Sequence, residues 1–316
     1  MSTEKLKETI QKVFPDVETV ICWQEGFDEL HTTPLFITAA DQTDKAVWNA
    51  LCCQNLASYL PSQKKKVAVV VKGCDSRTIV QFMEEGLIDR NNVIIIGIPC
   101  RGVVSVKKVL KAIDFQPIEN VTCTDGKVVV KTPKGETTLN VSDVWFDKCA
   151  TCQYPTPVIY DYLIGDAIVS DKPAESVYED VREFETKTLE ERKAYFDKEF
   201  SKCIRCYACR NACPMCVCQD SCIAETRDPH WITQKMSLTE KTMFHMIHSV
   251  HLAGRCVECG ECERVCPMDI PVAKIKKKIN AGMKELYDYS TGVNPDDKPP
   301  MYTFHVDEVK IKEHKL

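Results

Sequence analysis

The 316-residue sequence lacks any apolar run close to the ~20 residues that a membrane-spanning helix needs, so no spanning segment is predicted. It has no excess of Lys and Arg, the net charge being -5, and therefore no basic surface for nucleic acid is expected. The opening stretch MSTEKLKETIQKVF has no apolar signal-peptide core, which favours a cytoplasmic location. A G-x-G-x-x-G dinucleotide fingerprint is absent, and neither a Ser/His/Asp triad nor a carboxylate pair stands out, so no catalytic residue is predicted.

Cysteine, in contrast, is abundant: the chain has 19. Eleven of them lie between Cys203 and Cys266, so the excess is local rather than a general bias of composition. In a long chain without an export signal, clustered cysteines more often bind metal than form disulfides. The sequence therefore predicts a metal-binding module in this region.

Two runs in that region, CIRCYACRNACP and CVECGECERVCP, both fit the pattern C-x2-C-x2-C-x3-C-P. In this pattern the first three cysteines hold one [4Fe–4S] cluster, and the fourth, before proline, reaches the other cluster. Zinc also binds C-x2-C pairs, but each run here supplies a triple plus a Cys-Pro rather than two pairs. The predicted ligands are Cys203, Cys206, Cys209 and Cys266 for one cluster, and Cys256, Cys259, Cys262 and Cys213 for the other.

The 42 residues between the runs contain further cysteines and a predicted helix near 239–252. The extra cysteines are interpreted as buried thiols near the clusters, although an added ligand is an alternative; they are Cys216, Cys218 and Cys222. The helix carries three histidines on roughly one face, interpreted as a polar face, with ligation or proton transfer as the alternative; they are His245, His248 and His251.

The first half of the chain is predicted to be an α/β domain. Short apolar runs at 66–71 and 93–98 predict buried strands, and helices are expected after them, up to about 85 and over 104–113. Alternating strands and helices with short joints predict a parallel pair. Residues 120–141 predict a meander with turns at Asp125-Gly126 and Lys134-Gly135. A helix at the N-terminus, a strand at 34–38 and a helix over 44–60 are also expected.

The fold class predicted is thus an α/β N-terminal domain followed by an α+β ferredoxin-like domain for two clusters. The expected boundaries are 1–170 for the α/β domain, 171–201 for a linker and helix, 202–275 for the two-cluster domain and 276–316 for a C-terminal tail.

Four cysteines of the first domain indicate a third site. Cys74 and Cys100 each follow a predicted parallel strand, and the carboxyl ends of such strands share one edge of the sheet. Cys149 and Cys152 add a C-x2-C loop from the same domain. Spacing alone leaves three alternatives: a third [4Fe–4S] cluster, a zinc site, or two core thiols with an unrelated redox pair.

Five segments recur, in the same order, in a known family: KGCDSRTI, IIGIPCRG, KCATCQYPTPVIYDYLIGD, CIRCYACRNACPMCVCQDSC and CVECGECERVCPMDIP. Over about 34–275 the chain resembles the beta subunits of coenzyme F420 hydrogenases and dehydrogenases, above all those of formate dehydrogenase. The resemblance implies a third [4Fe–4S] cluster on Cys74, Cys100, Cys149 and Cys152, together with FAD.

One departure from the family concerns the flavin. The family has an N-terminal Cys-Gly-Gly segment associated with FAD, whereas residues 1–33 here contain a single glycine, Gly26. Close approach of backbone to a cofactor commonly needs glycine, so the departure argues against FAD.

The favoured function is an electron relay in an anaerobic oxidoreductase complex, through three [4Fe–4S] clusters and without bond chemistry on this chain. Expected partners are a formate dehydrogenase, a hydrogenase or a heterodisulfide-reductase-like protein, and a ferredoxin-type acceptor. The alternative is an FAD-containing beta subunit that exchanges hydride with F420 or a nicotinamide, and a more distant one is a zinc-stapled scaffold.

Overall fold

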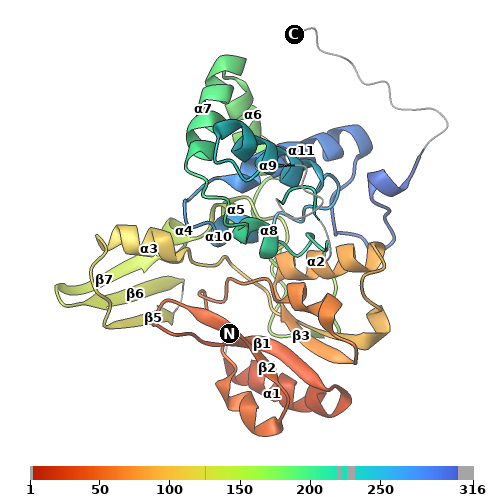
Figure 1. The fold of residues 1–316 in the computed structure, drawn as a ribbon. Coiled ribbons are helices and arrows are strands. Elements are labelled where there is room, and N and C mark those ends of the chain that lie inside the picture. Colours follow the sequence, from red (N-terminus) through yellow and green to blue (C-terminus); the bar gives the residue numbers. More distant parts are fainter. Residues whose placement is uncertain (1–2, 125, 219–221, 226–231, 305–316) are drawn as a thin grey trace.

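The computed structural model describes residues 3–124, 126–218, 222–225 and 232–304. Figure 1 shows a sheet with its helices in the lower half, a small second sheet to one side, and a helical module above both. No helix in these ranges is long and apolar enough to cross a membrane.

The main sheet has five strands in the order β2-β1-β3-β4-β8. Their bounds are Thr32–Ile37 (β2), Thr19–Glu25 (β1), Val67–Val71 (β3), Val93–Gly97 (β4) and Tyr162–Leu163 (β8). The predicted parallel pair is confirmed, because β3 and β4 align from Val67 opposite Val93 to Val71 opposite Gly97. All five residues of β3 are buried, as expected for a parallel strand covered on both faces. Helix α1 (Thr3–Val13) packs Leu6, Ile10 and Val13 into the same core.

Helices follow β3 and β4 directly. Helix α2 (Gly73–Glu84) begins two residues after β3, and Gly86, at φ +65°, ends it in the left-handed conformation that glycine favours. Helix α3 (Val106–Ala112) follows β4. Both predicted helices are confirmed, with bounds shifted by a few residues.

The helix predicted over 44–60 is wrong. Two 3-10 helices, Ala40–Lys45 and Leu56–Ser62, lie in this region with turns between them. The Asn49 side chain accepts a hydrogen bond from the Leu51 amide (2.8 Å), and Asn55 does the same for Ala57 (3.1 Å). Such local side-chain bonds compete with the helical backbone pattern and favour turns.

The predicted meander is confirmed as a separate antiparallel sheet, although Asp125 of its first turn lies outside the described residues. Its strands are Asn120–Thr124 (β5), Lys127–Thr132 (β6) and Gly135–Asn140 (β7), and two short helices follow, Val141–Val144 (α4) and Asp147–Ala150 (α5). Val128 and Val130 of β6 are buried in an apolar cluster shared with α3 and α4. This arrangement supports the segment that carries Cys149 and Cys152.

The module that follows is helical. Its helices are Glu179–Glu185 (α6), Leu189–Ser201 (α7), Ala208–Asn211 (α8), Leu238–Val250 (α9), Glu261–Arg264 (α10) and Val272–Tyr287 (α11). Within the described part of 202–275 there is no strand, so the α+β description of this domain is not met there. The cysteine-bearing loops run into one-turn helices instead of hairpins.

The segment expected to be a free tail begins as ordered structure. Helix α11 continues to Tyr287, and Tyr289 and Thr291 beyond it are buried. The Arg77 guanidinium on α2 donates to the Thr291 carbonyl at 2.8 and 3.1 Å. Thus the chain after α11 packs back on the sheet domain; residues 305–316 lie outside the described ranges.

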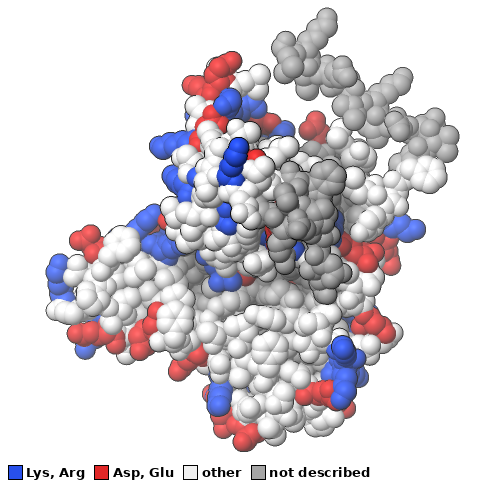
Figure 2. Space-filling model, in the orientation of Figure 1, with Lys and Arg blue, Asp and Glu red and all other residues white. Residues whose placement is uncertain are grey.

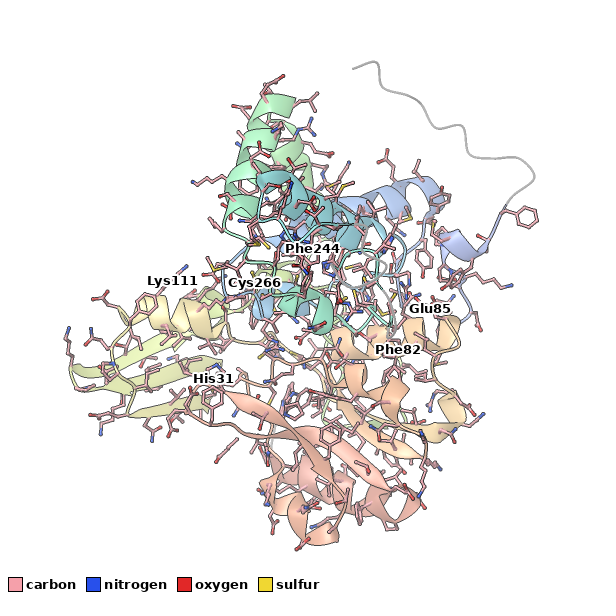
Figure 3. All side chains as sticks on the ribbon, in the orientation of Figure 1. His31, Phe82, Glu85, Lys111, Phe244 and Cys266 are labelled. Carbon is pink, nitrogen blue, oxygen red and sulfur yellow. The ribbon has the colours of Figure 1, made fainter. Side chains whose placement is uncertain are left out.

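Helix α2 also joins the sheet domain to the module. Glu85, just after α2, forms a two-point ion pair with Arg255 at 2.5 and 2.7 Å, and Phe82 packs against Met215 and Leu252. Phe82 and Glu85 are labelled in Figure 3. On the face of the molecule that Figure 1 presents, Figure 2 shows Lys and Arg interspersed with Asp and Glu around the outline. The described residues form no large area of one charge on this face.

Candidate iron–sulfur centres

The two cysteine runs of the module form the same loop twice. In each run the residues two and four positions after the first cysteine are in the left-handed conformation: Arg205 and Tyr207 in the first, Glu258 and Gly260 in the second. Each loop then enters a one-turn helix, α8 or α10. Non-glycine residues adopt positive φ rarely, so a matched pattern in both runs indicates one shared loop geometry.

The first predicted ligand set comes together across the two runs. Burial raises the pKa of Cys209 to about 12; nearby Lys276 lowers it, and the neighbouring Cys262, Cys266 and Cys203 raise it. Cys266 and Cys206 likewise raise the pKa of Cys203, after burial. Cys266, the fourth ligand from the second run, therefore lies beside the triple of the first run.

The second set shows the reciprocal crossing. Burial raises the pKa of Cys256 to about 12 and that of Cys262 to about 11, and Cys213 is a neighbour that raises both. Cys213 also raises the pKa of Cys259. Cys213 thus lies near the three cysteines of the second run, and the assignment of these residues as cluster ligands stays a prediction.

Backbone amides donate to several of these sulfurs. The Arg205 amide lies 3.3 Å from Cys203 Sγ, and the Ile270 amide lies 3.5 Å from Cys266 Sγ. Amide donors at sulfur tune the reduction potential of an iron–sulfur cluster.

The extra cysteines and histidines divide between the surface and the core. Cys218 is exposed, and Cys216 lies against Cys213 and His248, the three ligand atoms being within 4.8 Å of one another. Lys276 Nζ is 3.4 Å from His248 Nε2, which disfavours a separate metal cation at this point. Cys222 is half-buried and packs against the module core.

The histidine face is not polar as predicted. His245 and His248 are buried, and the His245 ring stacks on Phe200 with centroids 4.3 Å apart. Burial, together with the smaller effect of the nearby Lys276, lowers the pKa of His245 to about 4 and that of His248 to about 2. His251 is exposed.

The N-terminal cysteines meet at the carboxyl edge of the main sheet. Cys74 lies in the first turn of α2, and the loop that carries Cys152 is held against that turn. A Cβ at Gly73 would lie 1.7 Å from the Tyr154 carbonyl oxygen, so only glycine permits the contact. Ser76 Oγ accepts from the Val158 amide at 2.9 Å and fixes the same loop.

Further close contacts hold the loop of Cys100 and Gly102 against the segment that carries Cys149. The Cys100 amide donates to the Pro155 carbonyl at 2.7 Å. Gly102, at φ +122°, lies against the Trp145 ring, and a Cβ there would be 3.5 Å from Cys149 Cβ. Burial raises the pKa of Cys100 to about 12, and Cys149 and Cys152 contribute to the rise. Cys100 in turn raises the pKa of Cys74, so the four predicted residues of this domain lie near one another.

Three lysines lie among the cysteine sets, and the sequence reasoning missed all of them. Lys72 is fully buried, pairs with Asp75 at 2.8 Å and lies over the Trp23 ring at 4.2 Å. Lys276 is also buried, and Cys262, Cys213 and Cys256 raise its pKa against the effect of burial. Lys148 lies 3.9 Å from Cys74 Sγ. The apolar residues 67–71, directly before Lys72, indicated that this lysine is buried. No local sequence pattern indicates the positions of Lys148 and Lys276.

Lysines in these positions, Lys72 and Lys276 buried and Lys148 half-buried, fit an iron–sulfur centre. Four thiolates make such a centre anionic, and a buried anion is costly unless a countercharge lies nearby. The predicted sets of four cysteines also fit an iron–sulfur cluster, since thiolates are the soft sulfur ligands that such a cluster takes.

A cavity of about 710 Å³ lies next to the module loops, and Cys206 and Cys213 line it together with Arg210 and with Ser58 and Ser62 of the sheet domain. One predicted ligand of each module cluster thus borders this cavity.

Comparison with known proteins agrees with this interpretation. Residues 202–270 match a family described as 4Fe-4S dicluster domain, and residues 64–179 match the family that describes the C-terminal part of the coenzyme F420 hydrogenase/dehydrogenase beta subunit. The chain is therefore an iron–sulfur protein that joins an α/β region to a ferredoxin-like dicluster domain.

The resemblance to the F420 hydrogenase/dehydrogenase beta subunits is confirmed at whole-chain scale. The F420-dependent formate dehydrogenase subunit beta of Methanocaldococcus jannaschii is 25% identical over 90% of this chain and 90% of its own length. The F420-dependent formate dehydrogenase 1 subunit beta of Methanococcus maripaludis is also 25% identical, over 90% of this chain and 88% of its own. A chain of the F420-reducing [NiFe] hydrogenase complex from Methanosarcina barkeri is 18% identical, with a TM-score of 0.36 over 48% of this chain and 58% of its own.

Proposed function

We propose that this chain is the iron–sulfur electron-transfer beta subunit of an F420-dependent oxidoreductase complex, and that it holds three [4Fe–4S] clusters. The proposal is supported by the mutual pKa effects among cysteines of the three proposed sets of four. The sets are Cys203, Cys206, Cys209 and Cys266; Cys256, Cys259, Cys262 and Cys213; and Cys74, Cys100, Cys149 and Cys152.

When bound, clusters of this kind accept and donate single electrons. The residues of this chain hold and tune them: thiols supply the ligands, loop amides donate to sulfur, and buried lysines balance the charge. Because the thiols are protonated when free, assembly of each cluster must release protons to solvent.

Partners follow from the relay itself, which needs a donor and an acceptor. The relatives are named as subunits of formate dehydrogenase, so the catalytic protein of a formate dehydrogenase is the first partner proposed. A hydrogenase or heterodisulfide-reductase-like protein is the next, with a ferredoxin-type protein as the second redox partner and the cytoplasm as the compartment.

A second candidate function is an FAD-containing beta subunit that exchanges hydride with F420. It is favoured by the relatives' names, which call them F420-dependent, and opposed by the single glycine in residues 1–33. The two candidates differ in flavin content and not in the number of clusters.

The test is anaerobic purification of the full chain with measurement of iron, zinc, flavin and co-purifying proteins. About twelve iron atoms per chain, an absorbance shoulder near ~400 nm and no flavin would support the relay. Stoichiometric FAD would move the function to the second candidate. Zinc in place of iron would overturn both candidate functions and would indicate a zinc-stapled scaffold protein instead.

The third cluster has its own variant. In Cys149→Ser, iron should fall by about a third while the reduced-state EPR signals of the module clusters persist. Unchanged iron would show that the N-terminal cysteines hold no cluster.

A further inference from the structure

Lys148 reaches from the sheet domain to both neighbouring cysteine sets. Its Nζ lies 3.9 Å from Cys74 Sγ in the N-terminal set, and it donates a hydrogen bond to the carbonyl of Cys259 in the second-run set. The side chain starts one residue before Cys149, on the short helix α5. One ammonium group therefore lies beside residues of two different predicted ligand sets.

The second run is shaped to admit this side chain. A Cβ at Gly260 would lie 2.9 Å from Lys148 Cδ, and Gly260 is in the left-handed conformation at φ +72°. The equivalent position of the first run is Tyr207, at φ 59°, which has the same backbone conformation but carries a side chain where Gly260 has none. The difference between two otherwise matched loops thus selects which module cluster faces Lys148.

The groups around Lys148 favour its protonated, positively charged form. Burial lowers its pKa, but Cys74, Cys149 and Cys259 raise it well above its ordinary value, and Glu261 adds to this.

We propose that Lys148 is a shared charge that sets the reduction potentials of the N-terminal cluster and the second-run cluster together, and makes them adjacent steps of the relay. The inference rests on the proposed function. Adding one electron to either cluster adds one negative charge, which the ammonium stabilises, so it raises both potentials. If both clusters are bound, the electron that leaves one would reduce the other, and Lys148 would form or break no bond in that transfer.

Lys107 offers a matched control. Its Nζ, from α3, donates to the Cys266 carbonyl at 2.5 Å, so it also joins the sheet domain to a predicted ligand. Its partner is Asp269, and its side chain is 39% exposed, so its charge is largely neutralised and solvated. It approaches the first-run cluster and not the second.

The experiment is an anaerobic EPR redox titration of the full chain and of Lys148→Met, Lys148→Arg and Lys107→Met, with iron measured in each. In Lys148→Met the reduction potentials of the N-terminal and second-run clusters should both fall by about 59 mV. This shift corresponds to about a tenfold change in the equilibrium constant of a one-electron reduction. The first-run potential should stay in place. Lys148→Arg should retain wild-type potentials, and Lys107→Met should leave the N-terminal potential unchanged.

If Lys148→Met cannot hold its iron, Lys148→Gln keeps a donor for the Cys259 carbonyl without the charge and carries the same test. Full iron with unchanged potentials in the uncharged variant would overturn the inference. So would a fall in only one potential, or an equal fall in Lys148→Arg. A wild-type chain without iron would instead remove the proposed function itself.

Discussion

The cysteine sets of the module and of the sheet domain are built in different ways. In the module, three of the four residues of each set come from one short loop with a repeated left-handed pattern, and only the fourth is exchanged. In the sheet domain, the four come from three segments that meet at one edge of the sheet. The module sites therefore depend on local loop geometry, and the N-terminal site depends on tertiary packing.

The two regions also differ in how their sites are coupled. Cys203, Cys209, Cys262 and Cys266, drawn from both module sets, share one apolar cluster with Phe200 and Phe244. The N-terminal cysteines are half-buried and lie outside the main core of that domain. Damage to one module site should thus spread to the other, whereas damage to the N-terminal site should stay local.

The largest expected effect is that of Cys262→Ser. Cys262 is 6% exposed in the shared core, so the change should remove its own cluster and weaken the neighbour, lowering iron by between about one and two thirds. Iron per chain and EPR of the reduced protein measure this. A loss confined to one cluster, equal to that of Cys149→Ser, would remove the distinction between the two regions.

A smaller effect is expected from Gly73→Ala. The added Cβ would lie 1.7 Å from the Tyr154 carbonyl oxygen, so the loop that carries Cys152 must move away from α2. We expect loss of the N-terminal cluster, about a third of the iron, and about 1–3 kcal/mol of unfolding free energy. Urea denaturation and iron analysis provide the measurement.

Gly282→Ala is the control for this variant. Gly282 lies in α11 with no atom within 4 Å of an added Cβ, so alanine should leave iron unchanged and stabilise the helix by up to about 1 kcal/mol. Full iron in Gly73→Ala would mean that the N-terminal site does not depend on this contact.

The smallest effect concerns acid stability and His245. Its pKa is lowered from 6.5 to about 4 in the folded chain, so the unfolded chain takes up a proton first as the pH falls. The free energy of unfolding should be intact above about pH 6.5 and lose about 1.4 kcal/mol by pH 5.5. His245→Phe, which keeps a ring against Phe200, should remove that part of the loss in urea midpoints measured at pH 7.5 and 5.5.

His251→Phe, at an exposed position of the same segment, should keep the wild-type pH dependence. The same acid loss in His245→Phe as in the wild type would show that another group causes it.

Sequence reasoning went furthest where the signal is local. The apolar runs at 66–71 and 93–98 predicted β3 and β4 because a strand buried on both faces must be apolar throughout. The helix predicted over 44–60 was wrong, because the Asn49 and Asn55 side chains accept hydrogen bonds from nearby amides and favour turns there. The polar face predicted for His245 and His248 was also wrong, because these rings are buried against Phe200 and Phe244, which the local sequence does not reveal.

The sequence by itself determined the spacing within each cysteine run, because that pattern depends on residues a few positions apart. The predicted exchange of fourth cysteines joins residues of different runs, far apart in the chain, so it depends on how the two runs pack together. Only the tertiary structure brought Cys74 and Cys100 beside Cys149 and Cys152, since Gly73 and Gly102 permit contacts with segments far along the chain. It alone also placed Lys148 between two sites, because a charge acts through space on whatever the fold puts beside it.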